Sequence, residues 1–199
     1  MVPRLGPMTA TGSVGLSLRQ RIVASAVELT ADVGWAQVTM AKLADRVGVS
    51  RQTVYNEIGS KPALAESMIL AELDRFLHVV TDAFDRNPRD LVAAIRDAAD
   101  GVLELARGNQ LLHAVVSATH GADTELLPLL TTHAHSLLTA AKLVVGERVA
   151  PYDVPVAADK LDAAIDMVVR VVLSHVMQPS DTPAETAEDI AWIAARVLR

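Results

Sequence analysis

Residues 39–58 read TMAKLADRVGVSRQTVYNEI. Thr39 is a good N-cap, and the segment that follows it has apolar residues at helical spacing. Gly48 ends that segment, and Ser50 can cap a second one that ends at Gly59. The stretch therefore predicts two short helices joined by a glycine-bearing turn.

The second short helix divides into two faces by helical phase. Val54 and Ile58 turn inward, and the opposite face carries Gln52, Thr53, Tyr55 and Asn56, with Arg51 at its edge. A helix-turn-helix needs this division, because a core must hold one side of the recognition helix while the other side reaches the major groove. Amides pair with adenine and guanidinium groups with guanine, which makes Arg51, Gln52 and Asn56 the predicted base readers.

Charge is distributed unevenly along the chain. Residues 1–61 hold seven Lys and Arg against four acidic residues, whereas the rest holds eleven against twenty, and the total is −6. Phosphates attract a cationic segment and repel an acidic one, so the asymmetry favours a DNA-binding head on an acidic body. The predicted phosphate contacts are Thr39, Tyr55 and Lys61, and Thr53 joins the DNA-binding set through its outward position.

Several short motifs carry a family resemblance. They are Thr39-Met40, Leu43-Ala44, Val47-Gly48-Val49-Ser50, Thr53-Val54-Tyr55 and Ser60-Lys61-Pro62-Ala63-Leu64. Over residues 18–66 the combination resembles the DNA-binding signature of the TetR repressor family. The chain departs from the family's usual His-Phe pair at Glu57-Ile58. Isoleucine can substitute in the core, but a glutamate offers phosphate no favourable contact, so Glu57 is left out of the predicted interface.

The expected fold is all-α, with about nine helices, because apolar residues recur at helical spacing and alternating strand patterns are absent. We expect a flexible arm over 1–17, a three-helix DNA-binding domain over 18–61, and a ligand-binding and dimerisation domain over 62–199. The expected helices cover about 18–33, 39–47, 50–59, 62–85, 91–107, 111–119, 125–149, 161–176 and 183–199.

The last expected helix has the clearest start signal in the chain. Thr182 is a good N-cap, Pro183 stands at the first helical position, and Glu185 completes a capping box. The long helix over 62–85 is expected to connect the DNA-binding domain with the remainder of the chain.

The family resemblance implies a ligand cavity in the body. Apolar residues of three successive helices, with histidines as polar groups, indicate a small apolar effector. The predicted lining is Leu103, Leu112, His113, Val116, His120, Leu130, His133 and Leu137. A metal site is the alternative, but His133 and His135 diverge on a helix and no cysteine or Glu-x-x-His motif assists them. We expect no metal and no cofactor.

The last two helices predict a homodimer. Each is apolar over more than one stripe, and two apolar faces need two partners, one of which can be a second subunit. The predicted interface is Ile165, Val168, Val172, Ile190, Ala194 and Val197. A fully buried monomeric core is the alternative. Trp35 and Trp192 are interpreted as packing residues.

The resemblance thus implies a ligand-responsive repressor that binds palindromic double-stranded operator DNA as a dimer. The alternative is a helical small-molecule-binding dimer module without DNA-binding activity. An enzyme is disfavoured because no nucleophile–base pair or phosphate loop stands in the sequence. With no cysteine and no membrane-spanning apolar run, the cytoplasm is the expected location.

Overall fold

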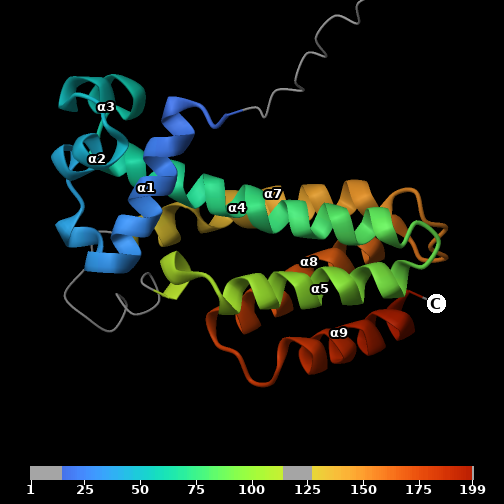
Figure 1. Cartoon of the computed structure of the whole chain (residues 1–199). Coiled ribbons are helices and arrows are strands. Elements are labelled where there is room, and N and C mark those ends of the chain that lie inside the picture. The colour runs from blue at the N-terminus through green and yellow to red at the C-terminus, as the bar shows by residue number, and fades with distance from the viewer. Residues whose placement is uncertain (1–14, 114–126, 199) are drawn as a thin grey trace, which may run out of the picture.

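The computed structural model describes residues 15–113 and 127–198, with only the backbone of 127–135. Within these ranges the chain forms helices and no strand, so the all-α prediction is confirmed (Figure 1). The helices are α1 (Leu18–Val33), the 3-10 helix η1 (Trp35–Gln37), α2 (Met40–Val47), α3 (Arg51–Ile58), α4 (Lys61–Arg86), α5 (Leu91–Arg107), α7 (Leu127–Val149), α8 (Ala158–Met177) and α9 (Pro183–Val197). Residues 110–113 are also helical. The expected arm over 1–17 lies mostly outside the described residues.

Helices α1, α2 and α3 and the start of α4 share a core of their own. Ile22, Leu43, Val54 and Leu64 are fully buried there. Trp35 closes the core from η1. We call this unit the head; Figure 1 shows it at one end of the molecule, where α4 leaves it. The predicted three-helix N-terminal head is confirmed, and its core continues into α4.

The rest of the molecule, which we call the body, is a layered helical bundle. Helix α4 packs along α5, α5 packs on α9, and α7 and α8 cover the remaining side (Figure 1). Phe84, Ile95 and Ile190 lie in its core. Where α4 ends, the Tyr152 hydroxyl donates to the carbonyl of Asn87 at 2.7 Å, which fixes the α7–α8 connection to α4. Among the described residues, no helix combines the length and hydropathy of a membrane span.

Helix α9 begins as its sequence predicts. The Thr182 side chain accepts from the Glu185 backbone amide at 3.3 Å, and the Glu185 carboxylate accepts from the Thr182 amide at 3.3 Å. The same carboxylate accepts from the Thr182 hydroxyl at 2.6 Å, and these hydrogen bonds lower the pKa of Glu185. This capping box satisfies two amides at the helix start, so the short connection from α8 ends sharply there.

Helices α4 and α5 approach each other closely at Gly101. A Cβ atom built on Gly101 would lie 2.6 Å from Cγ1 of Val79. Valine is β-branched and holds one preferred rotamer in a helix, so this methyl group cannot turn aside at low cost. Glycine is therefore required here by the packing of α4 on α5.

We expect Gly101→Ala to destabilise the protein by about 1–3 kcal/mol, the usual cost of overpacking, although alanine inside a helix is normally stabilising by about 0.5–1 kcal/mol. Thermal unfolding followed by circular dichroism measures the change. Removing the opposing methyl groups in Gly101→Ala/Val79→Ala should recover part of the loss. If Gly101→Ala melts above the wild type, the close approach does not constrain the helices.

Candidate nucleic-acid interface and ligand cavity

The turn between α2 and α3 adopts the conformation that its residues demand. Gly48 has φ 78° and ψ 39°, in the left-handed region that suits glycine, and its amide donates to the carbonyl of Ala44. The Ser50 side chain then accepts from the amide of Thr53 at 3.0 Å and begins α3. These local features fix the angle at which α3 leaves α2.

The two faces of α3 are those that helical phase predicts. Val54 and Ile58 are buried against the head core. Gln52 and Asn56 are exposed to solvent, and Tyr55 is 43% exposed. An exposed tyrosine between two exposed amides, on a helix held from behind, is the arrangement that major-groove reading needs.

Gln52 and Asn56 are joined to each other. The Gln52 Nε2 group donates to Asn56 Oδ1 at 2.9 Å, one helical turn away. Each amide is thereby restricted to fewer orientations before any DNA is present. The pair still holds donor and acceptor atoms beyond this bond, which is the combination that the major-groove edge of adenine requires.

The remaining predicted DNA-binding residues lie at the ends of helices. Thr39 caps α2 and its side chain accepts from the Lys42 amide at 3.2 Å. Lys61 opens α4, and its Nζ lies 4.8 Å from the centre of the Trp35 ring. The Thr53 hydroxyl pairs with Ser50 at 2.8 Å, and Arg51 is exposed. Helix N-termini offer amide groups and a positive dipole end to phosphate, so these placements are compatible with backbone contacts.

Three arginines of the head hold its helices together. Arg19, on α1, donates to the carbonyl of Glu57 and to the Ser67 hydroxyl, the latter at 2.8 Å. Arg21 donates to the carbonyl of Val47 at 3.0 Å. Arg46 pairs with two acids of α1, Glu28 at 3.1 Å and Asp32 at 3.3 Å. Sequence reasoning counted these arginines only as charge and missed their structural contacts, which join residues far apart in the chain.

The body contains an apolar cavity of about 150 Å³ between α4, α5, α7 and α8. Its lining is hydrocarbon throughout: Leu73, Phe76, Leu77, Val80, Phe84, Ile95, Ala98, Ala99, Val102, Ala141, Val145, Val168, Val169, Val172, Leu173 and Val176. We call it the apolar cavity. Helical periodicity does not distinguish these positions from core positions, because a helix face that lines a cavity has the same spacing of apolar residues as one packed in a core.

Three of the six residues of the predicted dimer interface are buried inside the subunit. Ile165, Ile190 and Ala194 are 8%, 4% and 3% exposed, because they pack in the subunit's own core. Val168 and Val172 are half-buried and line the apolar cavity. Val197 alone of the six is exposed. Sequence reasoning identified two apolar stripes on each helix but could not tell which stripe the subunit itself buries.

The other stripe of each helix is exposed. Met167 and Val171 of α8 are 63% and 38% exposed, and Trp192 and Ile193 of α9 are 58% and 52% exposed. With Val197 they form what we call the α8–α9 patch. The Arg196 guanidinium stacks 3.6 Å from the centre of the Trp192 ring. The interpretation of Trp192 as a packing residue is therefore wrong within the subunit.

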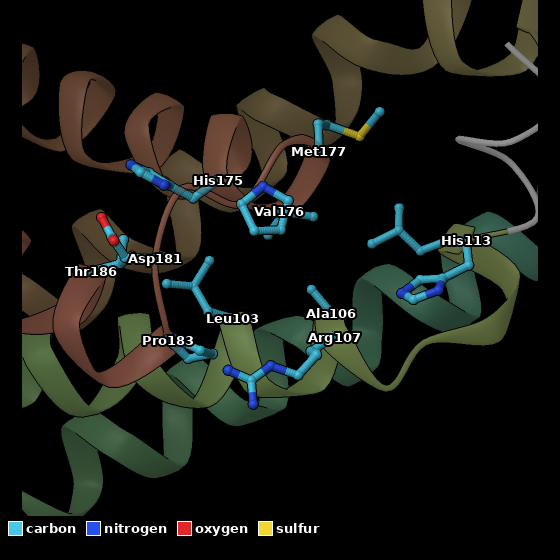
Figure 2. Close-up of a pocket in the computed structure, with 12 residues that line it drawn as sticks. Leu103, Ala106, Arg107, His113, His175, Val176, Met177, Asp181, Pro183 and Thr186 are labelled. Carbon is cyan, nitrogen blue, oxygen red and sulfur yellow. The ribbon is translucent and has the colours of Figure 1, made fainter. Parts of the chain in front are cut away.

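A second cavity, of about 330 Å³, lies between the end of α5, residues 110–113 and the connection from α8 to α9 (Figure 2). Most of its lining is apolar, but it also holds ionisable side chains, and we call it the polar cavity to distinguish it from the first. Three predicted ligand residues, Leu103, Leu112 and His113, line it. Arg107 and His175 line it too, and sequence reasoning missed both because they come from helices separated by the whole of α7.

The other predicted ligand residues are dispersed or not described. Leu137 lines a separate small cavity between α4 and α7. Val116 and His120 lie outside the described residues, and Leu130 and His133 fall where only the backbone is described. Among the side chains that the structure describes, no group of three His, Asp or Glu could hold a metal ion.

The head and the body meet where α5 ends. Leu111 is 5% exposed and packs in the head core although it follows α5 in the chain. Two residues earlier, the side-chain oxygen of the buried Asn109 accepts from the Leu112 amide at 2.8 Å and caps the next helical turn. The side-chain nitrogen of Asn109 donates to the Glu72 carboxylate of α4. The end of α5 is thus attached to both the head and the connecting helix.

Two family models match the chain. The bacterial regulatory proteins of the tetR family match residues 22–68, and the C-terminal domain of the bacterial tetracyclin repressor matches residues 90–196. The HTH-type transcriptional regulator AlkX of Mycobacterium tuberculosis is 29% identical over 178 residues, which cover 87% of this chain and 82% of that protein.

Solved structures of regulators resemble this chain over most of its length. The TetR family repressor AlkX of Dietzia sp. strain DQ12-45-1b, implicated in biodegradation of n-alkanes, has a TM-score of 0.72 at 25% identity, covering 92% of this chain and 95% of that one. A regulator from Mesorhizobium loti shares the fold at 13% identity, with a TM-score of 0.65 over 91% of this chain and 95% of that one.

A helix-turn-helix head with an exposed recognition helix, mounted on a helical body, agrees with the class of transcriptional regulators to which these family models and relatives point. The chain belongs to the TetR family. The sequence resemblance to that family is confirmed.

Proposed function

We propose that this protein is a repressor that binds a palindromic operator as a homodimer in the cytoplasm and releases it when a small molecule with an apolar portion enters the body. The observation that carries the proposal is the outward face of α3. Gln52, Tyr55 and Asn56 are exposed there, while Val54 and Ile58 anchor the helix from behind.

The α8–α9 patch supports the dimer. Isolated apolar residues are common on protein surfaces, but five large apolar side chains on two neighbouring helices form a surface that typically marks an interaction site. The connection from α8 to α9 is short, and the two helices run in opposite directions (Figure 1). A second copy, related by a two-fold axis, would bring two such pairs together as a four-helix interface.

The cavities and the junction support ligand control. A molecule in the apolar cavity would contact α4 and α5 together, and Leu111, in the helical residues that follow α5, packs in the head core. A ligand that prefers one arrangement of these helices shifts the equilibrium between DNA-binding and released states by its difference in affinity. A coupling of about 1–3 kcal/mol changes operator affinity roughly 5- to 150-fold.

The relatives favour repression and an apolar effector. The Dietzia structure is that of a repressor implicated in biodegradation of n-alkanes, and its likeness covers nearly the whole chain. Hydrocarbon-related chemistry agrees with a cavity whose lining is aliphatic and aromatic.

Two substitutions test the division of roles in the head. We expect Gln52→Ala to relax base preference, with a loss of about 1–3 kcal/mol at the base pair it reads, because a bidentate amide contact is removed. Lys61→Ala should weaken all sequences alike and reduce the salt slope by about one unit. Mobility shift against DNA from upstream of the gene, and against single-base variants of it, measures both effects. Equal behaviour of the two variants would contradict the assigned roles.

The rival proposal is a dimeric small-molecule-binding module that does not bind DNA, and Glu57 is the residue that favours it. This carboxylate is exposed on α3, where a phosphate would be repelled. The rival is correct if the wild-type protein binds no DNA fragment from upstream of its gene at low salt and the Glu57→Gln variant does bind one. Binding by both proteins, tighter in Glu57→Gln, supports the repressor.

A further inference from the structure

Helix α3 carries one acidic side chain, that of Glu57. The residue is exposed, and the part of the chain that the structure describes offers its carboxylate no hydrogen bond and no ion pair. Arg19 donates to the main-chain carbonyl of Glu57 and not to the carboxylate. A carboxylate is an acceptor with two oxygens, so Glu57 can accept hydrogen bonds from a partner beyond these residues.

Glu57 lies beside the outward amides of α3. Helical phase places it next to Asn56, on the flank that also carries Thr53 one turn earlier. Its backbone is held in position, because the Arg19 guanidinium joins the Glu57 carbonyl to the Ser67 hydroxyl of α4, the latter at 2.8 Å. A docking that brings the amides of α3 to base edges therefore brings this carboxylate into the major groove with them.

The major groove offers a carboxylate few suitable partners. Phosphates repel it, and a charge that loses water without gaining a partner costs free energy. The base edges present donors at two groups only, the N4 amino group of cytosine and the N6 amino group of adenine. Adenine has its N7 acceptor beside N6, and this acceptor repels a carboxylate, whereas cytosine presents the N4 donor alone. Cytosine is therefore the base that best satisfies a carboxylate.

From a carboxylate that no described residue pairs with, beside outward amides on the recognition helix, we infer that Glu57 determines operator specificity by accepting a hydrogen bond from the N4 amino group of a cytosine. It selects one C·G pair in each half-site and disfavours sequences that face the carboxylate with acceptors. The inference rests on the proposed operator binding, and it adds a base and the residue that reads it.

Selection from a library of duplexes with randomised half-sites tests the inference, with the full-length wild type and Glu57→Gln. We expect the wild type to enrich cytosine at one position of each half-site. Glutamine pairs with the N6 and N7 groups of adenine, so Glu57→Gln should shift the preference at that position from cytosine to adenine by about fivefold or more. The preferences at the other positions should stay as in the wild type.

Glu66→Gln is the matched control, because it makes the same change at an exposed glutamate of α4. It should select the same bases as the wild type at every position. If Glu57→Gln binds more tightly yet selects the same bases as the wild type, Glu57 only repels phosphates and the inference is overturned. A change of base preference in Glu66→Gln equal to that in Glu57→Gln overturns it as well.

Replacing the selected cytosine tests the contact atom by atom. A dU·dA pair puts the O4 acceptor of uracil where cytosine has its N4 donor, and it adds no methyl group. We expect this replacement to weaken wild-type binding about tenfold and to weaken Glu57→Gln at least about fivefold less, measured by fluorescence anisotropy. The difference should persist at higher salt, which screens phosphate repulsion for all sequences alike. Equal losses in the two proteins contradict the contact.

The repressor proposal and this inference fail in different ways. A wild type that binds no DNA contradicts both. A wild type that selects an operator, but shows no cytosine preference that depends on Glu57, contradicts the inference alone.

Discussion

Ile193→Glu is expected to convert the protein into a monomer. Ile193 is 52% exposed in the subunit, so glutamate costs the folded subunit little. In a two-fold interface the same carboxylate enters twice and lies near its own copy, unpaired and desolvated. Substitutions at the centre of an interface cost about 2–4 kcal/mol or more. We expect the dimer dissociation constant to rise at least about thirtyfold to a thousandfold.

We expect the monomeric variant to lose operator binding as well. Two recognition helices bound as one unit gain affinity that a single head lacks, so we expect operator affinity to fall by at least about a hundredfold. Analytical ultracentrifugation measures the oligomeric state, and fluorescence anisotropy with labelled operator measures binding. Circular dichroism must show that the variant still melts close to the wild type.

Ala184→Glu is the matched control for this experiment. It adds the same charge to an exposed position of α9, half a helical revolution away from Ile193 by phase. We expect it to remain dimeric and to bind the operator normally. If Ile193→Glu is dimeric at micromolar concentration, or if the wild type is itself a monomer, the α8–α9 patch is not the subunit interface.

Leu111→Ala is expected to disconnect the head from the body. Leu111 belongs to the body by sequence and to the head core by packing, and it is 5% exposed. Replacing a buried leucine with alanine costs about 2–5 kcal/mol. The cavity would open at the boundary between the two units, so we expect the single calorimetric unfolding transition of the wild type to divide into a head transition and a body transition.

Operator DNA provides a second readout that needs no knowledge of the effector. Coupling between two sites is reciprocal, so DNA bound to the head should raise the melting temperature of the body in the wild type. In Leu111→Ala, operator DNA should raise the melting temperature of the head and leave that of the body unchanged. The control is Leu91→Ala, at the start of α5 and far from the head, which should lower the stability of the body and keep the two units coupled. Coupled melting in Leu111→Ala would show that the contact does not transmit the signal.

The head could be predicted from sequence because its determinants are local. The left-handed Gly48, the caps at Thr39 and Ser50, and the inward phase of Val54 and Ile58 each depend on residues within a few positions. Local backbone chemistry decides such features whatever the rest of the chain does. The capping box at Thr182 was predictable for the same reason.

The body could be predicted only as a set of helices. Periodicity gave the right elements but not their neighbours, because a stripe facing the subunit's own core and a stripe facing a partner have the same composition. Ile190 and Ile193 illustrate this: both are isoleucines of α9, yet the first is 4% exposed and the second 52%. The polar cavity was not predicted for a similar reason, since Arg107 and His175 come to line one cavity only after their helices have packed.

The contacts of Arg19 have a consequence for how such a regulator can change over generations. Its guanidinium joins the end of α3 to α4, so a displacement of one of these helices is resisted by the other. Under the proposed function, substitutions on the outer surface of α3 would change the preferred operator and leave this connection in place. Target preference and ligand response could then diverge independently among proteins that share this arginine.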